Sequence, residues 1–152
     1  MEVYMDRTGS NIFMNSTPVG KIPKSRAEEI KVSVLRNNMI DIRINYYFGT
    51  DSEPRPTKRG VWISFENLPK ILDSFSDLAK DPGKTVELEF EKNETEKIRV
   101  YNNEFRGNRL VHIRSFYLED DEYKPGKGVS FSITLLPKVT EVLKEAEKYR
   151  QK

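Results

Sequence analysis

Apolar and polar side chains alternate along several short stretches of the chain, and a different spacing follows each set of stretches. Residues 30–34, 40–44 and 61–65 carry an apolar side chain at every second position, which is typical of antiparallel strands with one buried face. The spacing then becomes helical on two segments, at Leu68, Ile71, Leu72, Phe75 and Leu78 and again at Leu136, Val139, Val142, Leu143 and Ala146. The pattern therefore predicts strands that lead into amphipathic helices.

The same order of elements occurs twice, because the two halves of the chain resemble each other. Residues 56–70 align with residues 125–138 once Arg59 is skipped, and residues 40–48 align with residues 111–119. Neither copy alone is long enough to bury an adequate core. We therefore predict an α+β fold with two repeats of a curved antiparallel β-sheet followed by an α-helix, which pack as an intramolecular pseudo-dimer.

The predicted boundaries are an N-terminal arm over residues 1–27, a first repeat over 28–80 and a second repeat over 84–152. Prolines and glycines favour an extended chain in the arm, with one short strand expected at residues 12–14. An additional strand is expected between the copies at residues 86–90. The third strand of each repeat is expected to follow a longer connection punctuated by proline and glycine.

Several kinds of chemistry are excluded by composition. The chain has no cysteine and one histidine, so we expect no disulfide, no catalytic triad, no metal site and no cofactor. Four acidic residues over 119–122 are interpreted as a solvated turn. No apolar run is long enough to span a membrane, and because residues 1–13 have neither a basic nor an apolar region of the signal-peptide kind, we do not expect secretion. We expect a non-enzymatic intracellular protein, in the cytoplasm or nucleoid of a prokaryote or the nucleus of a eukaryote.

Basic and aromatic residues gather on the predicted strands, although the net charge is only +2. Cations that contact phosphates and flat rings that stack on bases are what single-stranded nucleic acids require. By alternation, Arg43, Arg114 and Trp62 point away from the helices, and Trp62 serves either for stacking or to cover a seam. Further candidates are the exposed pair Phe105 and Arg106, together with Arg109, Lys124, Lys127 and Gly128 in the second copy and Lys58, Arg59 and Gly60 in the first.

The second copy resembles the DNA-binding domain of the transcriptional positive cofactor four (Sub1-like) coactivator family. The resemblance rests on Phe105-Arg106-Gly107, on the strand over residues 111–117 and above all on the Lys-Pro-Gly-Lys-Gly-Val-Ser run over residues 124–130. It implies a four-stranded sheet followed by a helix, assembly as a dimer and binding of single-stranded or unwound DNA. The implied contact residues are Phe105, Arg106, Arg114, Tyr117, Lys127 and Gly128, with Arg43, Tyr46, Lys58, Arg59 and Gly60 in the first copy.

The chain departs from that family at two positions. Tyr117 stands where the family has a tryptophan, and Asn108 stands where it has a lysine. The tandem copies also resemble, less closely, the Pur-alpha type of single-strand binder. We therefore predict a single-stranded DNA-binding protein of the coactivator type with little sequence specificity, acting in transcription, replication or repair. The alternatives are an RNA-binding protein of the Pur-alpha type and a protein-interaction scaffold, and further homodimerisation is open.

Overall fold

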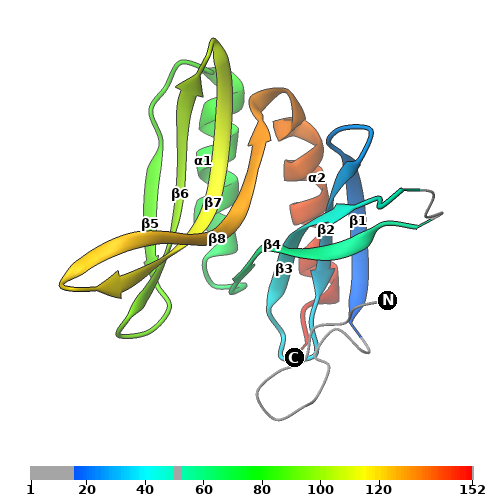
Figure 1. Ribbon diagram of the computed structural model, residues 1–152, viewed down its shortest axis with the longest axis horizontal. Helices are drawn as coiled ribbons and strands as arrows, with labels where there is room; N and C mark the ends of the chain where they lie inside the picture. The colour runs from blue at the N-terminus through cyan, green and yellow to red at the C-terminus, as the bar shows by residue number, and fades with distance from the viewer. Residues whose placement is uncertain (1–15, 50–52, 152) are drawn as a thin grey trace.

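The computed structural model describes residues 16–49 and 53–151, which form two four-stranded antiparallel sheets and two helices (Figure 1). The first sheet has the order β1 (Thr17–Pro23), β2 (Glu28–Val34), β3 (Ile40–Tyr46) and β4 (Arg55–Ile63), and α1 (Leu68–Lys80) follows it. The second sheet has the order β5 (Glu87–Glu91), β6 (Glu96–Phe105), β7 (Asn108–Glu119) and β8 (Glu122–Ser132). It leads through the short helix η1 (Ile133–Leu135) into α2 (Leu136–Ala146) and η2 (Glu147–Tyr149).

The predicted alternation is what divides each sheet into a core face and an outer face. The even-numbered residues of β2 and β3, from Ile30 to Ile44, are all buried against the helices. In the second sheet, Val100 on β6 and Val111 and Ile113 on β7 do the same. All of these residues belong to one apolar cluster. The two repeats therefore share a core, as expected of copies too small to fold alone.

The helices begin where the sequence predicts, each with a proline in its first turn, where the missing N–H costs no hydrogen bond. Their packing crosses between the repeats. Helix α2 contacts β1 and β2 of the first sheet, and Arg150, just beyond it, lies 3.5 Å from Glu66 of the first repeat. On the other side, the ring of Phe75 in α1 lies 6.2 Å from that of Phe131 in β8. Each helix thus covers the sheet of the other copy (Figure 1).

The two sheets meet at β4 and β8, and the two helices contact each other beneath them. The predicted pseudo-dimer is confirmed. The hairpins β3–β4 and β7–β8 extend outward from this junction in opposite directions (Figure 1). Among the described residues, no helix has the length and apolar character needed to cross a bilayer.

Two details of the predicted organisation differ from the structure. The first sheet begins at Thr17 instead of residue 28, because Thr17–Pro23 pairs with β2 as an edge strand. An edge strand tolerates Pro18 and Pro23, and Gly20 leaves room for Val142 of α2, whose Cγ1 would lie 2.9 Å from an added Cβ. The strand expected at residues 12–14 lies outside the described residues.

The second difference is the connection between β7 and β8. Instead of a long loop it is a two-residue turn, Asp120-Asp121, closed by the pairing of Glu119 with Glu122. Both aspartates have positive φ, 52° and 64°, as a type I′ hairpin turn requires. The strands on either side are consequently longer than predicted, and the hairpin reaches beyond the core.

Candidate nucleic-acid interface

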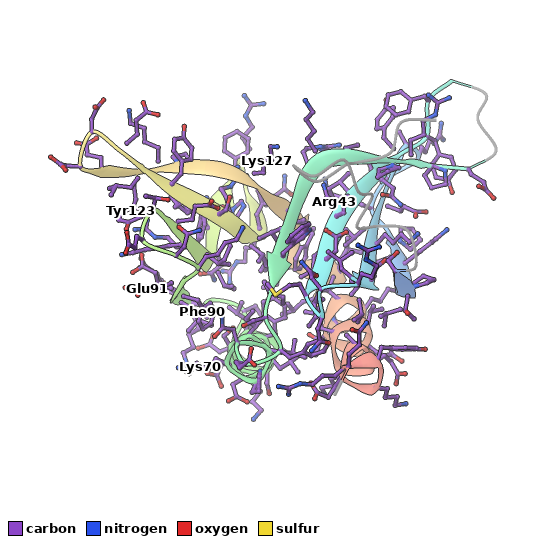
Figure 2. All side chains as sticks on the ribbon, turned by 90° about the horizontal axis from the view of Figure 1, so that it is seen from below. Arg43, Lys70, Phe90, Glu91, Tyr123 and Lys127 are labelled. Carbon is purple, nitrogen blue, oxygen red and sulfur yellow. The ribbon has the colours of Figure 1, made fainter. Side chains whose placement is uncertain are left out.

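The face of each sheet opposite the helices, called here the outer face, carries the predicted binding residues at matching places. In the first sheet Arg43 pairs with Lys31 on one side and Gly60 on the other. In the second, Arg114 pairs with Arg99 and Gly128. Figure 2 shows Lys127 on the side of the molecule away from Lys70 of α1. The helices therefore lie on the other side of the sheets, although Asp41, Arg43 and Asn45 on the outer face of the first sheet are themselves buried.

In both copies a β-bulge interrupts the pairing of the third and fourth strands, next to the arginine that occupies the same position in the two repeats. The register shifts between Arg43 and Asn45 in the first sheet and between Arg114 and Phe116 in the second. The arginine holds the bulge in each case: Nη1 of Arg43 donates to the Thr57 carbonyl at 2.7 Å, and Nη1 of Arg114 donates to the Gly126 carbonyl at 2.8 Å. One role of these arginines is therefore structural.

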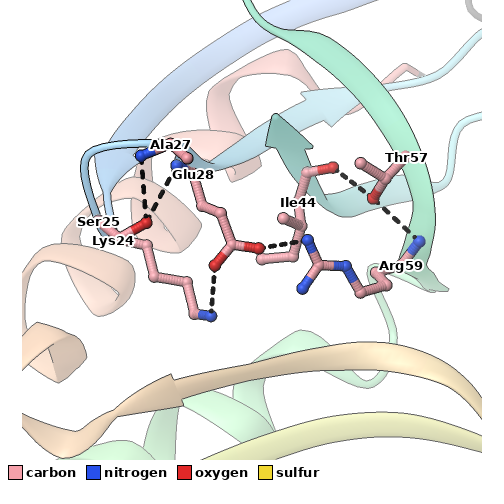
Figure 3. Close-up of polar contacts among 7 residues, drawn as sticks. All are labelled: Lys24, Ser25, Ala27, Glu28, Ile44, Thr57 and Arg59. Atoms are coloured by element: carbon pink, nitrogen blue, oxygen red, sulfur yellow. Dashed lines mark hydrogen bonds and ion pairs between the residues drawn. The ribbon is translucent and has the colours of Figure 1, made fainter. Parts of the chain in front are cut away.

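The first bulge contains the extra residue that the alignment of the copies skips. Thr57 Oγ1 donates to the Ile44 carbonyl at 2.7 Å and accepts the Arg59 N–H at 3.1 Å (Figure 3). The Arg59 guanidinium bonds Glu28, which Lys24 also contacts at 3.2 Å. Partial burial opposes ionisation of Glu28, but the hydrogen bonds from Arg59 and Lys24 lower its pKa. Arg59 is therefore already partnered by an acid.

Arg43 is neutralised as well. Its Nη2 lies 2.9 Å from Oδ1 of Asp41, and the two side chains are 11% and 5% exposed. Burial raises the pKa of Asp41, against the effect of Arg43 and of a hydrogen bond from Trp62. The outer face of the first sheet therefore contains a buried ion pair at its centre, where the prediction had an available cation.

The second sheet has no acid at the corresponding position, because His112 aligns with Asp41. His112 is held by Ser130 at 2.7 Å and Asn103 at 2.9 Å and stacks on Tyr101 with ring centroids 4.7 Å apart. Burial, and then the charge of Arg114, lowers the pKa of His112. No carboxylate in the described part of the chain forms an ion pair with Arg114, so the second repeat keeps its central positive charge.

Two exposed lysines stand at equivalent places in the bulges. Lys58 and Lys127 make no ion pair with any residue that the structure describes. Lys124, by contrast, lies 3.0 Å from Glu119. On the neighbouring strand, Arg99 packs over the Phe116 ring at 4.5 Å and also bonds Glu89 at 2.8 Å. Lys127 and Arg114 are therefore the cations of the second bulge that no acid offsets.

The bulge glycines are buried, and the packing around them explains their identity. A Cβ on Gly60 would lie 2.6 Å from Cζ of Arg43, and one on Gly128 would lie 2.5 Å from the Ile113 carbonyl oxygen. Both distances are shorter than any normal contact. These glycines shape the bulge, and the lysines beside them are the exposed residues.

The turn between β6 and β7 presents an aromatic and a cation together. Phe105 is 58% exposed, and the Arg106 guanidinium lies 5.1 Å from the centre of its ring. Arg106 and Gly107 adopt positive φ, 51° and 79°, in a type I′ turn.

Arg109 lies at the same end of the sheet, 3.4 Å from a Cβ built on Gly83. Asn108 and Arg114 are six positions apart along β7, roughly 20 Å, so the predicted residues form two groups and not one.

An aromatic cluster in the first repeat was missed by the sequence analysis. The ring of Tyr46 lies 4.7 Å from that of Phe48, Arg55 lies 5.7 Å from the Phe48 ring, and Phe48 is 48% exposed. The run Tyr46-Tyr47-Phe48 was the available signal. In the second repeat Tyr117, 40% exposed, lies on the corresponding hairpin. Tyr46, which strict alternation places on the buried face with Ile42 and Ile44 and a strand-end bulge would expose, is half-buried just after the bulge.

Trp62 has the seam position that sequence reasoning left open. It pairs with Asp41 across β3 and β4, and Nζ of Lys92, from the β5–β6 hairpin of the other repeat, lies 6.0 Å from its ring. Its ring is half-buried between the copies. No cluster of potential metal ligands occurs among the residues that the structure describes.

Fold and outer face together define a sheet-plus-helix pseudo-dimer whose exposed side carries paired basic bulges. The family model of transcriptional coactivator p15 (PC4) matches residues 92–142, within the second repeat. A PC4 homolog from Burkholderia pseudomallei, solved in a tetragonal crystal form, is 30% identical over 42% of this chain and 96% of that one, with a TM-score of 0.38. In its orthorhombic crystal form the same homolog is 31% identical over 45% of this chain and 93% of that one, with a TM-score of 0.39.

The chain belongs to the transcriptional coactivator p15 (PC4) family. No curated protein matches it. The match to the family model confirms the resemblance predicted from the sequence. Membership of a coactivator family is consistent with the prediction that the chain is not an enzyme.

Proposed function

We propose that this protein binds single-stranded DNA on its outer face, with little sequence preference, and that the second repeat is the stronger binding half. The observation that carries the proposal is the difference between the two bulges. Arg43 is neutralised by Asp41 at 2.9 Å, whereas Arg114 has His112 in that place and adjoins the exposed Lys127. Cations without an acid partner attract phosphates most strongly, because no internal ion pair has to be broken.

Stacking groups support the same proposal. Phe105, Phe48 and Tyr117 are exposed aromatic rings, at 58%, 48% and 40%, and Arg106 and Arg55 lie over the first two. Every base has a flat face, so contacts of this kind do not require a particular sequence. Because single strands arise when duplex DNA is opened, we propose a role inside the cell in transcription, replication or repair. The scaffold alternative is weakened because Glu89 of the acidic strand already binds Arg99 and Lys97, which lower its pKa.

The test is a set of binding curves measured by fluorescence anisotropy with end-labelled oligo-dT, oligo-rU and a duplex of equal length, each at two salt concentrations. We expect oligo-dT to bind most tightly and its affinity to fall with salt at a log–log slope of about −0.7 per phosphate contacted. Tighter binding of oligo-rU than of oligo-dT would indicate an RNA-binding protein instead. Equal binding of the duplex, or no binding of either single strand, would refute it.

A further inference from the structure

A pocket of about 250 Å³ lies between the two repeats. The first repeat contributes Trp62, Ser64 and Asn67, and the second contributes Phe90, Lys92 and Ile98. Phe90 and Ile98 are buried and form an apolar wall, while Glu91 and Lys92, whose Nζ lies 3.4 Å from Glu96, are exposed at the rim. The pocket adjoins the outer face, because Trp62 pairs with Asp41 at the edge of the first sheet.

Two polar side chains in this pocket make no side-chain hydrogen bond with any residue that the structure describes. Asn67 occupies the N-cap position of α1 but makes no capping hydrogen bond with its side chain, although asparagine is among the best capping residues. Ser64 likewise makes no side-chain hydrogen bond within the described residues. In the second repeat the equivalent Ser132 does cap its helix, accepting the Thr134 N–H at 3.3 Å. The amide of Asn67 and the hydroxyl of Ser64 are therefore free to bind a ligand.

The aromatic wall is held in position before any ligand binds. Trp62 is half-buried, pairs with Asp41 across β3 and β4, and has Nζ of Lys92 6.0 Å from its indole ring. An indole packed in this way presents a flat surface at little cost in side-chain entropy. The second repeat has no equivalent aromatic wall, because Ser130 occupies the position of Trp62 there and bonds His112 at 2.7 Å.

We infer that this seam pocket binds one nucleobase, stacked on Trp62 and hydrogen-bonded by the Asn67 amide, with the adjoining phosphate near Lys92. An apolar cavity of ~150 Å³ holds a benzene ring, so the space suffices for a base. An asparagine amide offers the adjacent donor and acceptor that pair with a base edge. The base comes either from a bound strand, in which case the inference rests on the proposed function, or from a free nucleotide.

The experiment uses Trp62 as a reporter, because it is the only tryptophan in the chain. The full-length protein is titrated with oligo-dA, with an abasic sugar-phosphate oligomer of equal length and with AMP. Binding is followed by tryptophan fluorescence and, for the two oligomers, by anisotropy of an end label. The variants are Asn67→Asp, which keeps a capping residue before α1 but removes the amide donors, and Lys92→Gln, with Lys70→Gln on the helix side as its control (Figure 2).

We expect oligo-dA to change Trp62 fluorescence saturably and the abasic oligomer to bind without doing so. Asn67→Asp should weaken oligo-dA binding about fivefold and leave abasic binding within twofold, and Lys92→Gln should exceed Lys70→Gln in effect. An equal fluorescence response to both oligomers, or no effect of Asn67→Asp, would overturn the pocket while leaving strand binding intact. If neither oligomer binds, the proposed function fails, and AMP decides the pocket alone: saturable quenching lost in Asn67→Asp supports it, and no quenching refutes it.

Discussion

The arginines at equivalent positions of the two repeats should give opposite phenotypes when each is replaced by alanine. Removing Arg43 leaves Asp41, 5% exposed, without its partner, and an unpaired buried charge costs about 3 kcal/mol. Removing Arg114 loses a single hydrogen bond to the Gly126 carbonyl, worth about 1 kcal/mol. Arg43→Ala should therefore be the more destabilising substitution, which urea denaturation measures directly.

DNA binding should show the reverse order. Under the proposed function, Arg114→Ala removes one phosphate contact and releases the bulge that holds Lys127, so two contacts should be lost. At about −0.7 each, the log–log salt slope for oligo-dT should become shallower by about 1.4. Between 50 and 200 mM salt, two contacts correspond to an affinity change of about sevenfold. Arg43→Ala should change the slope by less than half as much, because Asp41 already neutralises that arginine.

The assay is anisotropy of labelled oligo-dT at several salt concentrations, below the temperature at which either variant begins to unfold. Arg43→Lys, which retains the charge, separates loss of charge from loss of fold in the first repeat. An equal change of slope in Arg43→Ala and Arg114→Ala would refute the asymmetry. So would a larger loss of stability in Arg114→Ala.

Three further outcomes are expected. Gly128→Ala should lower the free energy of unfolding by about 1–3 kcal/mol, because its Cβ would lie 2.5 Å from the Ile113 carbonyl oxygen; an unchanged urea midpoint would contradict this. The lowered pKa of His112 means that the folded state binds its proton less well than the unfolded state, so stability should fall as pH drops below about 6.5. His112→Gln should flatten that part of the stability–pH curve, and an unaltered curve would exclude His112 as the cause. Phe48→Ala should weaken oligo-dT binding by about 1 kcal/mol or more without a change of melting temperature, provided that Phe48 stacks on a base.

Much of the fold was predictable because a sheet with one buried face imposes a period of two. Ile30, Ile42 and their neighbours are buried as the alternation requires, and the repeated order located both helices. The partner of each helix was not predictable. An apolar stripe such as that of α1 indicates that one face of the helix is buried, but not against which copy. In the structure, Phe75 of α1 contacts Phe131 of the other repeat.

The candidate site was predictable in composition more than in electrostatics. Alternation placed Arg43 on the outer face, and it also placed Asp41 there, two residues away on the same strand. Their ion pair could therefore have been predicted from the sequence. The edge strand at Thr17–Pro23 was missed because its prolines favour a loop reading. The pairing of Arg59 with Glu28 depends on a strand far away in sequence, and no local pattern reports it.

Joining both halves in one chain has a consequence for how such a protein can change. In a dimer of identical subunits every substitution occurs on both sides of the symmetry axis. An acid beside the central arginine would therefore neutralise that arginine on both faces together. Here the acid occurs once, at Asp41, and the histidine occurs once, at His112. Fusion has released the two halves from that symmetry, so one can specialise in stability while the other keeps its charge for a ligand.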